Sequence, residues 1–291
     1  MKAESFSTPW QTLGTVPMAD LADAKVQLHW AAQIVAAFGN GLLQPQPDDS
    51  QSNLGWNVAL GALCSHPTSD GWSVGLRLAN LTLLFLTPNN TIQEEFGLSG
   101  QTLQQGFEWL ASTYAKVSEA PLPKPFALRE YDMPSHPVEK NAVFELNHDA
   151  AFQELHHWYE NAHQVIRTVS EKWKEASPIR CWPHYFDIAT LVSLPLPQNN
   201  GSTGTVGCGM SPGDASYAEP YFYVTVWPYP EKEKLPGLTV GKWHTEGFVA
   251  AVLTASDLLS SGQTETQAER VHQFLHKSSE LAFAALGASP S

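Results

Sequence analysis

The order of secondary-structure patterns along the chain constrains the fold more than any single motif. A helical period, several strand patterns and a second helical period occupy residues 20–120, and the same order returns over residues 145–288. A proline-rich connector, residues 121–144, separates the two halves. Because each half offers few strands, one combined domain buries more apolar surface than two separate domains would. We therefore expect one α+β domain, residues 1–291, with pseudo-twofold symmetry, in which each half is a small, mainly antiparallel sheet flanked by helices.

The helices and strands follow from apolar periodicity and from the turn residues between the segments. In the first half, apolar residues recur at helical spacing from Leu21, and Gly39 is a stop signal. Strand patterns and a second helix then follow at 56–63, 72–87, 91–98 and 99–117. In the second half we expect helices and strands at 148–176 (helix), 181–194, 221–230, 247–254 and 265–286 (helix).

Charge and cysteine content limit the partners of this chain. The formal net charge is -13, with 16 Lys and Arg against 29 Asp and Glu and no basic cluster. Such a surface repels phosphate backbones and anionic membranes. No apolar run approaches the roughly 18 residues that cross a bilayer, and the first residues lack a signal-peptide pattern. Three isolated cysteines, Cys64, Cys181 and Cys208, indicate a reducing compartment. We expect a cytoplasmic protein with a small-molecule partner and with neither nucleic acid nor membrane as partner; a homodimer is left open.

The stretch "RCWPHYFDIATL", residues 180–191, places polar side chains in a pattern that otherwise predicts a buried strand. In one regular strand, Trp182 and His184 point to one face and Asp187 to the other. His184 and Asp187 converge only through a bulge or turn, which Pro183 makes plausible. His184 is then either a hydrogen-bonded structural residue or a ligand or general base. A buried Asp187 needs a hydrogen-bond donor.

A second stretch, residues 207–230, combines a turn with an aromatic strand. Pro212 and Gly213 predict a turn that ends at Asp214. In the strand that follows, alternation puts one set of side chains on a polar-tipped aromatic face and leaves the other set for the core. The aromatic face holds Glu219, Tyr221, Tyr223, Thr225 and Trp227. This face is either a binding surface or ordinary sheet packing.

A third stretch, "GKWHTEGF", places His244 and Glu246 two residues apart, and therefore on one face of an extended strand. That spacing suits metal chelation or a base paired with its orienting carboxylate, although a solvent-facing His and Glu near the start of a strand are the commoner explanation. Nucleotide-binding glycine motifs, a nucleophile elbow and HExxH are absent from the sequence. No cofactor is evident, and a divalent metal is left open, with His184, His244 and Glu246 as candidate ligands.

Several of these segments together resemble a bacterial family of uncharacterised proteins, catalogued as domain of unknown function 5996. The resemblance rests on "LHWAAQIV", "WPHYFDIATLVSL", "GMSPGDASYAEPYFYVTVWPYP" and the closing helix "VHQFLHKSSELAFAAL", and spans residues 25–285. The positions that carry it are Trp182, Phe186, Asp187, Gly213, Glu219, Pro220, Tyr221 or Phe222, Tyr223 and Pro228. His184 departs from the family pattern. The resemblance implies one domain and no particular activity.

Two hypotheses of function follow from these stretches. In the first, the protein is an enzyme that performs acid–base or metal-assisted hydrolytic chemistry on a small molecule. In the second, the same side chains bind a ring-bearing or sugar ligand without reaction. In a third interpretation, the segments are plain core and the protein acts through its surface. The expected catalytic residues are Asp187, Glu219, His184 and His244; the expected ligand-binding residues are Trp182, Tyr221, Tyr223, Trp227, Trp243 and Asp214.

Overall fold

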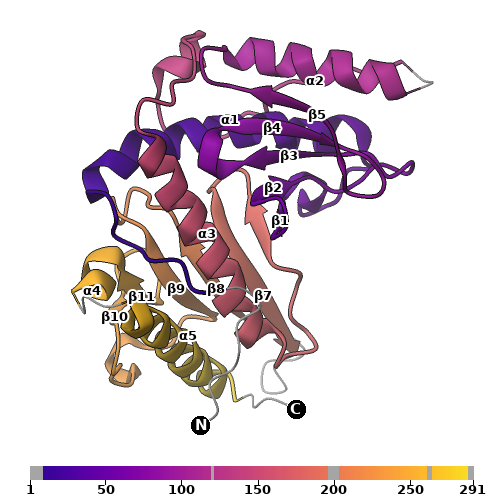
Figure 1. The fold of residues 1–291 in the computed structure, drawn as a ribbon. Helices are drawn as coiled ribbons and strands as arrows, with labels where there is room; N and C mark the ends of the chain where they lie inside the picture. Colours follow the sequence, from indigo (N-terminus) through magenta and orange to yellow (C-terminus); the bar gives the residue numbers. More distant parts are fainter. Residues whose placement is uncertain (1–8, 119–120, 196–202, 261–263, 288–291) are drawn as a thin grey trace. The chain divides into compact units, whose positions relative to one another are not determined.

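A computed structural model describes residues 9–118, 121–195, 203–260 and 264–287 of the chain (Figure 1). Helices and two antiparallel sheets give the α+β class that the sequence predicts. The chain divides into two compact units. Unit 1 comprises Met1–Thr15, His157–Ile179 and Asp187–Ser291, and unit 2 comprises Val16–His156 and Arg180–Phe186.

Unit 2 contains a five-stranded antiparallel sheet with strands in sequence order. Such a meander forms because short apolar strands are joined by tight turns, which only antiparallel neighbours allow. Helix α1 packs against strand β3, and helix α2 packs against β4 and β5. The elements are α1 (Leu21–Leu42), β1 (Gly55–Asn57), β2 (Ala62–Cys64), β3 (Ser73–Arg77), β4 (Thr82–Leu86), β5 (Ile92–Gly97) and α2 (Leu103–Val117).

Helix α1 does not stop at Gly39, as its sequence predicts, but continues to Leu42. The glycine has a packing role instead, because a Cβ at position 39 would overlap the backbone oxygen of Gln51. Helix α2 begins at a capping box, in which the Thr102 hydroxyl accepts from the Gln105 backbone N–H and the Gln105 side chain accepts from the Thr102 N–H.

Unit 1 is built on an antiparallel sheet in which five strands run in the order β10, β11, β9, β8, β7. Helix α5 packs on β8 and β9 (Figure 1). Trp158 of helix α3 lies 5.8 Å from Phe222, ring centroid to ring centroid. The helices therefore cover the face that carries Phe222. The elements are α3 (Asp149–Ser170, which begins in unit 2), β7 (Asp187–Pro195), β8 (Thr203–Ser211), β9 (Tyr221–Trp227), β10 (Lys242–His244), β11 (Ala250–Thr254), α4 (Ala255–Leu259) and α5 (Thr264–Ala285).

Strand β8 is not predicted by the sequence, which shows only a glycine-rich stretch and a turn there. Glycine is depleted in strands because it has no side chain to pack, so the segment lacks a strand pattern. In the sheet, β8 pairs with β7 from Thr203 to Met210 and with β9 from Thr205 to Ser211, and Gly207 and Gly209 are both buried. The glycines are present because neighbouring side chains occupy the space that a Cβ would need.

The stretch that begins at Arg180 is two strands and not one. Strand β6 (Arg180–Trp182) ends at a turn, and β7 starts at Asp187. Phe186 closes the turn with φ 57°, a left-handed conformation that non-glycine residues rarely adopt. The prediction of a turn within this segment, which Pro183 made plausible, is therefore confirmed, and the prediction of one regular strand is wrong. The turn also separates the units, so that His184 belongs to unit 2 and Asp187 to unit 1.

Candidate functional site

The candidate site lies on the face of the unit 1 sheet opposite Phe222. Alternation along β7, β8 and β9 places five side-chain positions together there, and we call them the tyrosine face: Asp187, Ala189, Gly209, Tyr221 and Tyr223. The strand register puts Ala189 opposite Gly209, and Gly209 opposite Tyr223. Two small residues thus lie side by side, next to two tyrosines and a carboxylate.

Tyr223 lies over Gly209 and reaches the carboxylate of Asp187, two strands away. A Cβ at position 209 would overlap the phenol end of Tyr223 and would lie 2.8 Å from the Cβ of Ala189. The glycine therefore opens the space that the ring occupies. The Tyr223 hydroxyl donates a hydrogen bond to Oδ2 of Asp187. The sequence predicted that Asp187 needs a donor, and Tyr223 supplies it.

The environment of Asp187 favours its protonated form. Burial raises the pKa of the Asp187 carboxyl to about 6, and the negative charge of Asp214 acts in the same direction. The hydrogen bond from Tyr223 and the backbone N–H of Asp187 itself lower this pKa in part. Burial and the neighbouring charge of Asp187 also raise the pKa of the Tyr223 hydroxyl, which stays protonated. Asp187 can therefore gain and lose a proton near neutral pH, with Tyr223 as a fixed donor.

The second carboxylate oxygen of Asp187 is left without a partner. Its Oδ1 atom is buried, and no other described residue makes a hydrogen bond to it. An unpaired buried oxygen costs about 1–3 kcal/mol, and more when it is charged. Such an atom is expected either to disfavour the ionised carboxylate or to receive a donor from a bound molecule.

A turn beside the tyrosine face holds the second tyrosine. Oδ1 of Asp214 accepts hydrogen bonds from the backbone N–H groups of Ser216 and Tyr217, at 2.7 and 3.1 Å. This arrangement leaves Oδ2 for the hydroxyl of Tyr221, which donates to it at 2.6 Å. Gly213, with φ 109°, allows the turn. Asp214 therefore orients Tyr221 from a surface turn.

His244 is at the end of the same network, but both of its ring nitrogens have partners. The Tyr217 hydroxyl lies 3.1 Å from Nδ1, and the backbone oxygen of Glu246 lies 2.7 Å from Nε2. A carbonyl oxygen only accepts, so Nε2 donates to it, and in the neutral ring Nδ1 then accepts from Tyr217. Strand β10 ends at His244, and the Glu246 side chain makes no bond to the ring. The extended strand that would bring the two side chains onto one face is therefore not formed.

Three further predicted residues have other surroundings. Oε2 of Glu219 accepts from the backbone N–H and the hydroxyl of Ser256, both at 2.6 Å, so it ties β9 to the start of α4. Trp243 donates to the backbone oxygen of Pro236, and alternation puts it on the other face of β10 from His244. Trp227 lies farther along the strand from Tyr223 and is 53% exposed.

The remaining predicted residues, Trp182 and His184, belong to unit 2. The His184 ring lies among three aromatic rings, with centroids 5.9, 5.6 and 4.2 Å from Trp182, Tyr131 and Tyr185. Burial lowers the pKa of His184, and the charge of Asp49 raises it in part. In the sequence, nothing pointed to Tyr131, because it lies in the connector.

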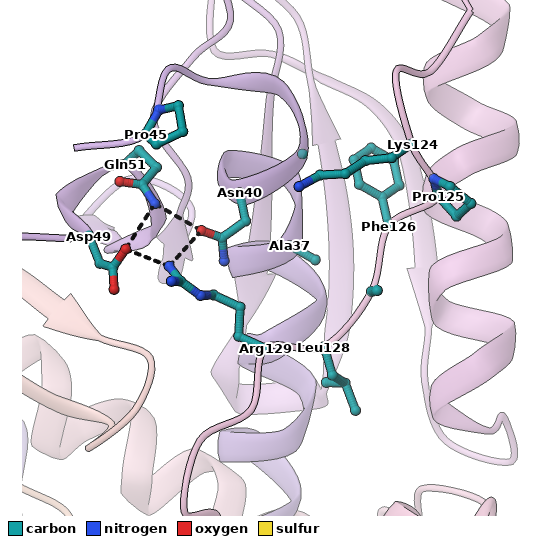
Figure 2. Close-up of a pocket in the computed structure, with 12 residues that line it drawn as sticks. Ala37, Asn40, Pro45, Asp49, Gln51, Lys124, Pro125, Phe126, Leu128 and Arg129 are labelled. Carbon is teal, nitrogen blue, oxygen red and sulfur yellow. Dashed lines mark hydrogen bonds and ion pairs between the residues drawn. The ribbon is translucent and has the colours of Figure 1, made fainter. Parts of the chain in front are cut away.

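Unit 2 also contains a cavity of about 290 Å³ that the sequence does not predict (Figure 2). It forms between the end of α1, the loop that follows, and the proline-rich connector. We call it the Lys124 cavity. Its lining residues are Ala37, Asn40, Gly41, Pro45, Asp49, Gln51, Lys124, Pro125, Phe126, Ala127, Leu128 and Arg129. In the sequence, the only feature that could have pointed to this cavity is the pair of basic residues Lys124 and Arg129 in the proline-rich connector.

Neither a metal cluster nor a membrane-spanning helix is found among the described residues. Within the described ranges, no three His, Cys, Asp or Glu side chains gather as a metal site. Among the described helices, none combines the length and the apolar character needed to cross a membrane.

The chain was compared with known proteins in three ways. No family model, no curated protein and no solved structure matches it. The resemblance to the family of domain of unknown function 5996 therefore stays a prediction.

Proposed function

We propose that the tyrosine face of unit 1 binds a small molecule and exchanges a proton with it through Asp187. The single observation that carries this proposal is the buried Oδ1 of Asp187, an acceptor without a partner on a carboxyl whose pKa is about 6. A ligand hydroxyl or N–H would satisfy that oxygen. Ionised Asp187 would then accept a proton from the ligand, and the neutral acid would return it.

The aromatic residues give the ligand its expected shape. Tyr217, Tyr221 and Tyr223 form a continuous group, with ring centroids 5.0 and 6.0 Å apart between neighbours. Aromatic rings with polar tips suit planar rings or sugars, because both an apolar face and hydroxyl groups are offered. Asp214 orients Tyr221 and Asp187 orients Tyr223, so each hydroxyl has a defined direction. The alternative function is binding of such a ligand without chemistry.

The acid–base version is preferred over the metal-assisted version for a geometric reason. His244 uses both ring nitrogens within unit 1, and Glu246 offers it a backbone oxygen and not a carboxylate. A divalent metal at His244 would have to displace one of these bonds. A divalent metal bound by His184, with or without His244 and Glu246, is kept as a second proposal.

The first test is a ligand-observed NMR screen of monosaccharides and small planar heterocycles, at a pH on either side of 6. Hits should shift the ¹³C signal of the Asp187 carboxyl and should lose binding in Asp187→Asn. Asp70→Asn, an exposed aspartate in unit 2, is the matched control and should bind normally. Conversion of a hit that depends on ionised Asp187 supports the enzyme; binding without conversion supports the binding protein. Hits that bind Asp187→Asn as well as the wild type contradict both.

We further propose that the two halves are related by a pseudo-twofold axis and form one domain of the family of domain of unknown function 5996. The supporting observation is that each unit has a helix, then the strands of an antiparallel sheet, then a second long helix, with α1 and α2 in one case and α3 and α5 in the other; the strand order within the two sheets differs. One cooperative unfolding transition, seen identically by calorimetry and by tryptophan fluorescence, is expected of a single domain. Two separate transitions would contradict it.

The cellular setting is part of the same proposal. A cytoplasmic location fits three cysteines that form no disulfide, Cys64, Cys181 and Cys208. A homodimer, with neither nucleic acid nor membrane as partner, is the proposed state. Light scattering coupled to size-exclusion chromatography measures the mass directly, and a monomer at all concentrations would contradict the dimer.

A further inference from the structure

We propose that the Lys124 cavity of unit 2 binds a small organic carboxylate with a short apolar tail. This inference is independent of the function proposed for unit 1. It rests on the charges, the free donors and the apolar wall of the cavity (Figure 2).

The charged groups of the cavity leave one cation over. Arg129 donates to Oδ1 of Asp49 at 2.6 Å, which completes an ion pair at one end. The hydrogen bond to Arg129 lowers the pKa of Asp49, and the same bond raises the pKa of Arg129, so both stay charged. In the part of the chain that the structure describes, Lys124 has neither an ion pair nor a hydrogen bond. The lining therefore carries two cations against one anion, in a chain whose net charge is -13.

The polar wall of the cavity is fixed by a network that leaves an amide donor free. Oδ1 of Asn40 accepts from Nε2 of Gln51 at 3.0 Å and from Arg129 at 3.4 Å. Oε1 of Gln51 in turn accepts from the backbone N–H of Gln46 at 2.8 Å. These bonds use the Asn40 oxygen and fix the orientation of the amide group. Its Nδ2 donates to no described residue and can therefore donate to a ligand. Lys124 and Asn40 therefore both line the cavity with an uncommitted donor, cationic in Lys124 and neutral in Asn40.

Figure 2 shows how these donors lie relative to the cavity. The Lys124 side chain extends from the connector with its ammonium group directed toward the α1 side, where Asn40 lies. A carboxylate between them receives a charge-assisted bond from Lys124 and a second bond from Asn40. A phosphate would find only one uncommitted cation here.

The rest of the lining is apolar. Phe126 is 8% exposed, and its ring occupies the space beside Gly41, where a Cβ would lie 2.9 Å from the ring. The other apolar lining residues are Ala37, Pro45, Pro125, Ala127 and Leu128. A cavity of about 290 Å³ lies at the lower end of the range for small-molecule sites, so the tail has to be short.

The experiment uses three four-carbon probes that differ in their head group: butyrate, butyramide and butylamine. Each is titrated into the full chain, and the side-chain amide signals of Asn40 and Gln51 are followed by ¹H–¹⁵N NMR. Butyrate should move the Asn40 amide signal and should bind at least about tenfold more tightly than butylamine, because its charge is complementary to Lys124. Added sodium chloride should weaken the binding.

Variants locate the site. Lys124→Gln should weaken butyrate binding by about five- to tenfold, and Lys124→Arg should retain most of it. Lys174→Gln changes the same charge at an exposed lysine of unit 1 and should leave binding unchanged. Asn40→Asp keeps the acceptor for Gln51 and Arg129, replaces the free donor with a charge and should abolish binding. Equal affinity for butyrate and butyramide, tighter binding of butylamine, no binding of butyrate, or normal binding by Lys124→Gln would each overturn the proposal.

Discussion

Gly209 lies directly beneath the ring of Tyr223, and the missing side chain is what lets Tyr223 reach Asp187. A Cβ at position 209 would overlap the phenol end of the ring and lie 2.8 Å from Ala189. The hydrogen bond between Tyr223 and Asp187 therefore depends on a residue of the strand between them. Gly209 has no functional group of its own, but its small size allows the hydrogen bond to Asp187, the carboxyl of the tyrosine face, whose pKa is raised.

Gly209→Ala should destabilise the protein and disturb Asp187. Because the added methyl group meets Tyr223 and Ala189, we expect a loss of about 1–3 kcal/mol in the free energy of unfolding, measured with urea. Gly237→Ala, at an exposed glycine with nothing within 4 Å of its Cβ position, is the matched control and should change stability little. Equal effects of the two substitutions would show that the Tyr223 packing is unimportant.

Asp187 should make unit 1 less stable as the pH rises. Its pKa is about 6 in the folded protein against 3.8 for an unburied aspartate, so the folded state holds a proton that the unfolded state has released between these values. The free energy of unfolding should therefore fall as the pH rises through this window, by about 3 kcal/mol at about 1.4 kcal/mol per pKa unit. Above pH 6 Asp187 is ionised in the folded protein, and the full loss in the free energy of unfolding is present. Asp187→Asn should remove this slope, and a slope that persists in the variant would assign it to another group.

Tyr223→Phe should raise the pKa of Asp187 further. The Tyr223 hydroxyl donates to the carboxylate and lowers its pKa, so loss of the donor removes a stabilisation of the ionised form. The ¹³C carboxyl titration of Asp187 should move to a midpoint above 6, by about one pH unit. Tyr221→Phe is the control, because Tyr221 donates to Asp214 and not to Asp187. A midpoint that falls in Tyr223→Phe would refute the assigned hydrogen bond.

His29 should give unit 2 the opposite dependence on pH. Burial lowers the pKa of His29 to about 4 from 6.5, and its Nε2 is bonded to the Pro183 backbone oxygen at 2.7 Å. The unfolded state binds the proton first as the pH falls, so stability is complete above 6.5 and is lost toward pH 4. The loss is about 3 kcal/mol at the lower limit. It should be absent in His29→Gln, as measured by urea unfolding across this range; an unchanged acid slope would exclude His29 as its source.

Glu219→Gln should act on stability and not on ligand binding. Glu219 accepts two bonds from Ser256 at the start of α4, so its charge supports a helix terminus. We expect a loss of about 1 kcal/mol in the free energy of unfolding. Ligands found for Asp187 should bind the variant normally. A loss of ligand binding without a loss of stability would show instead that Glu219 acts in the site, as the sequence pattern predicted.

Local sequence patterns determined much of this protein by themselves. The α+β class, the four long helices, and the division of β9 into a core face with Phe222 and a polar aromatic face with Tyr221 and Tyr223 are all confirmed. The predicted strand stretches 56–63 and 72–87 are each two strands, β1 with β2 and β3 with β4. Apolar periodicity and turn chemistry act over a few residues, so they can be read from the chain directly. The need of Asp187 for a donor followed from the same local argument.

The tertiary structure decided what local patterns do not contain. Strand β8 was hidden because its glycines are selected by Tyr223 and by Thr225, which lie on the neighbouring strand. Strand β10 ends at His244, so the Glu246 side chain does not share a strand face with it as the sequence predicted. The turn before Asp187 places His184 in unit 2 and Asp187 in unit 1. The Lys124 cavity joins residues about eighty positions apart, such as Asp49 and Arg129. Periodicity describes the two faces of one segment, whereas packing between segments decides which side chains meet, and that is settled only when the whole chain folds.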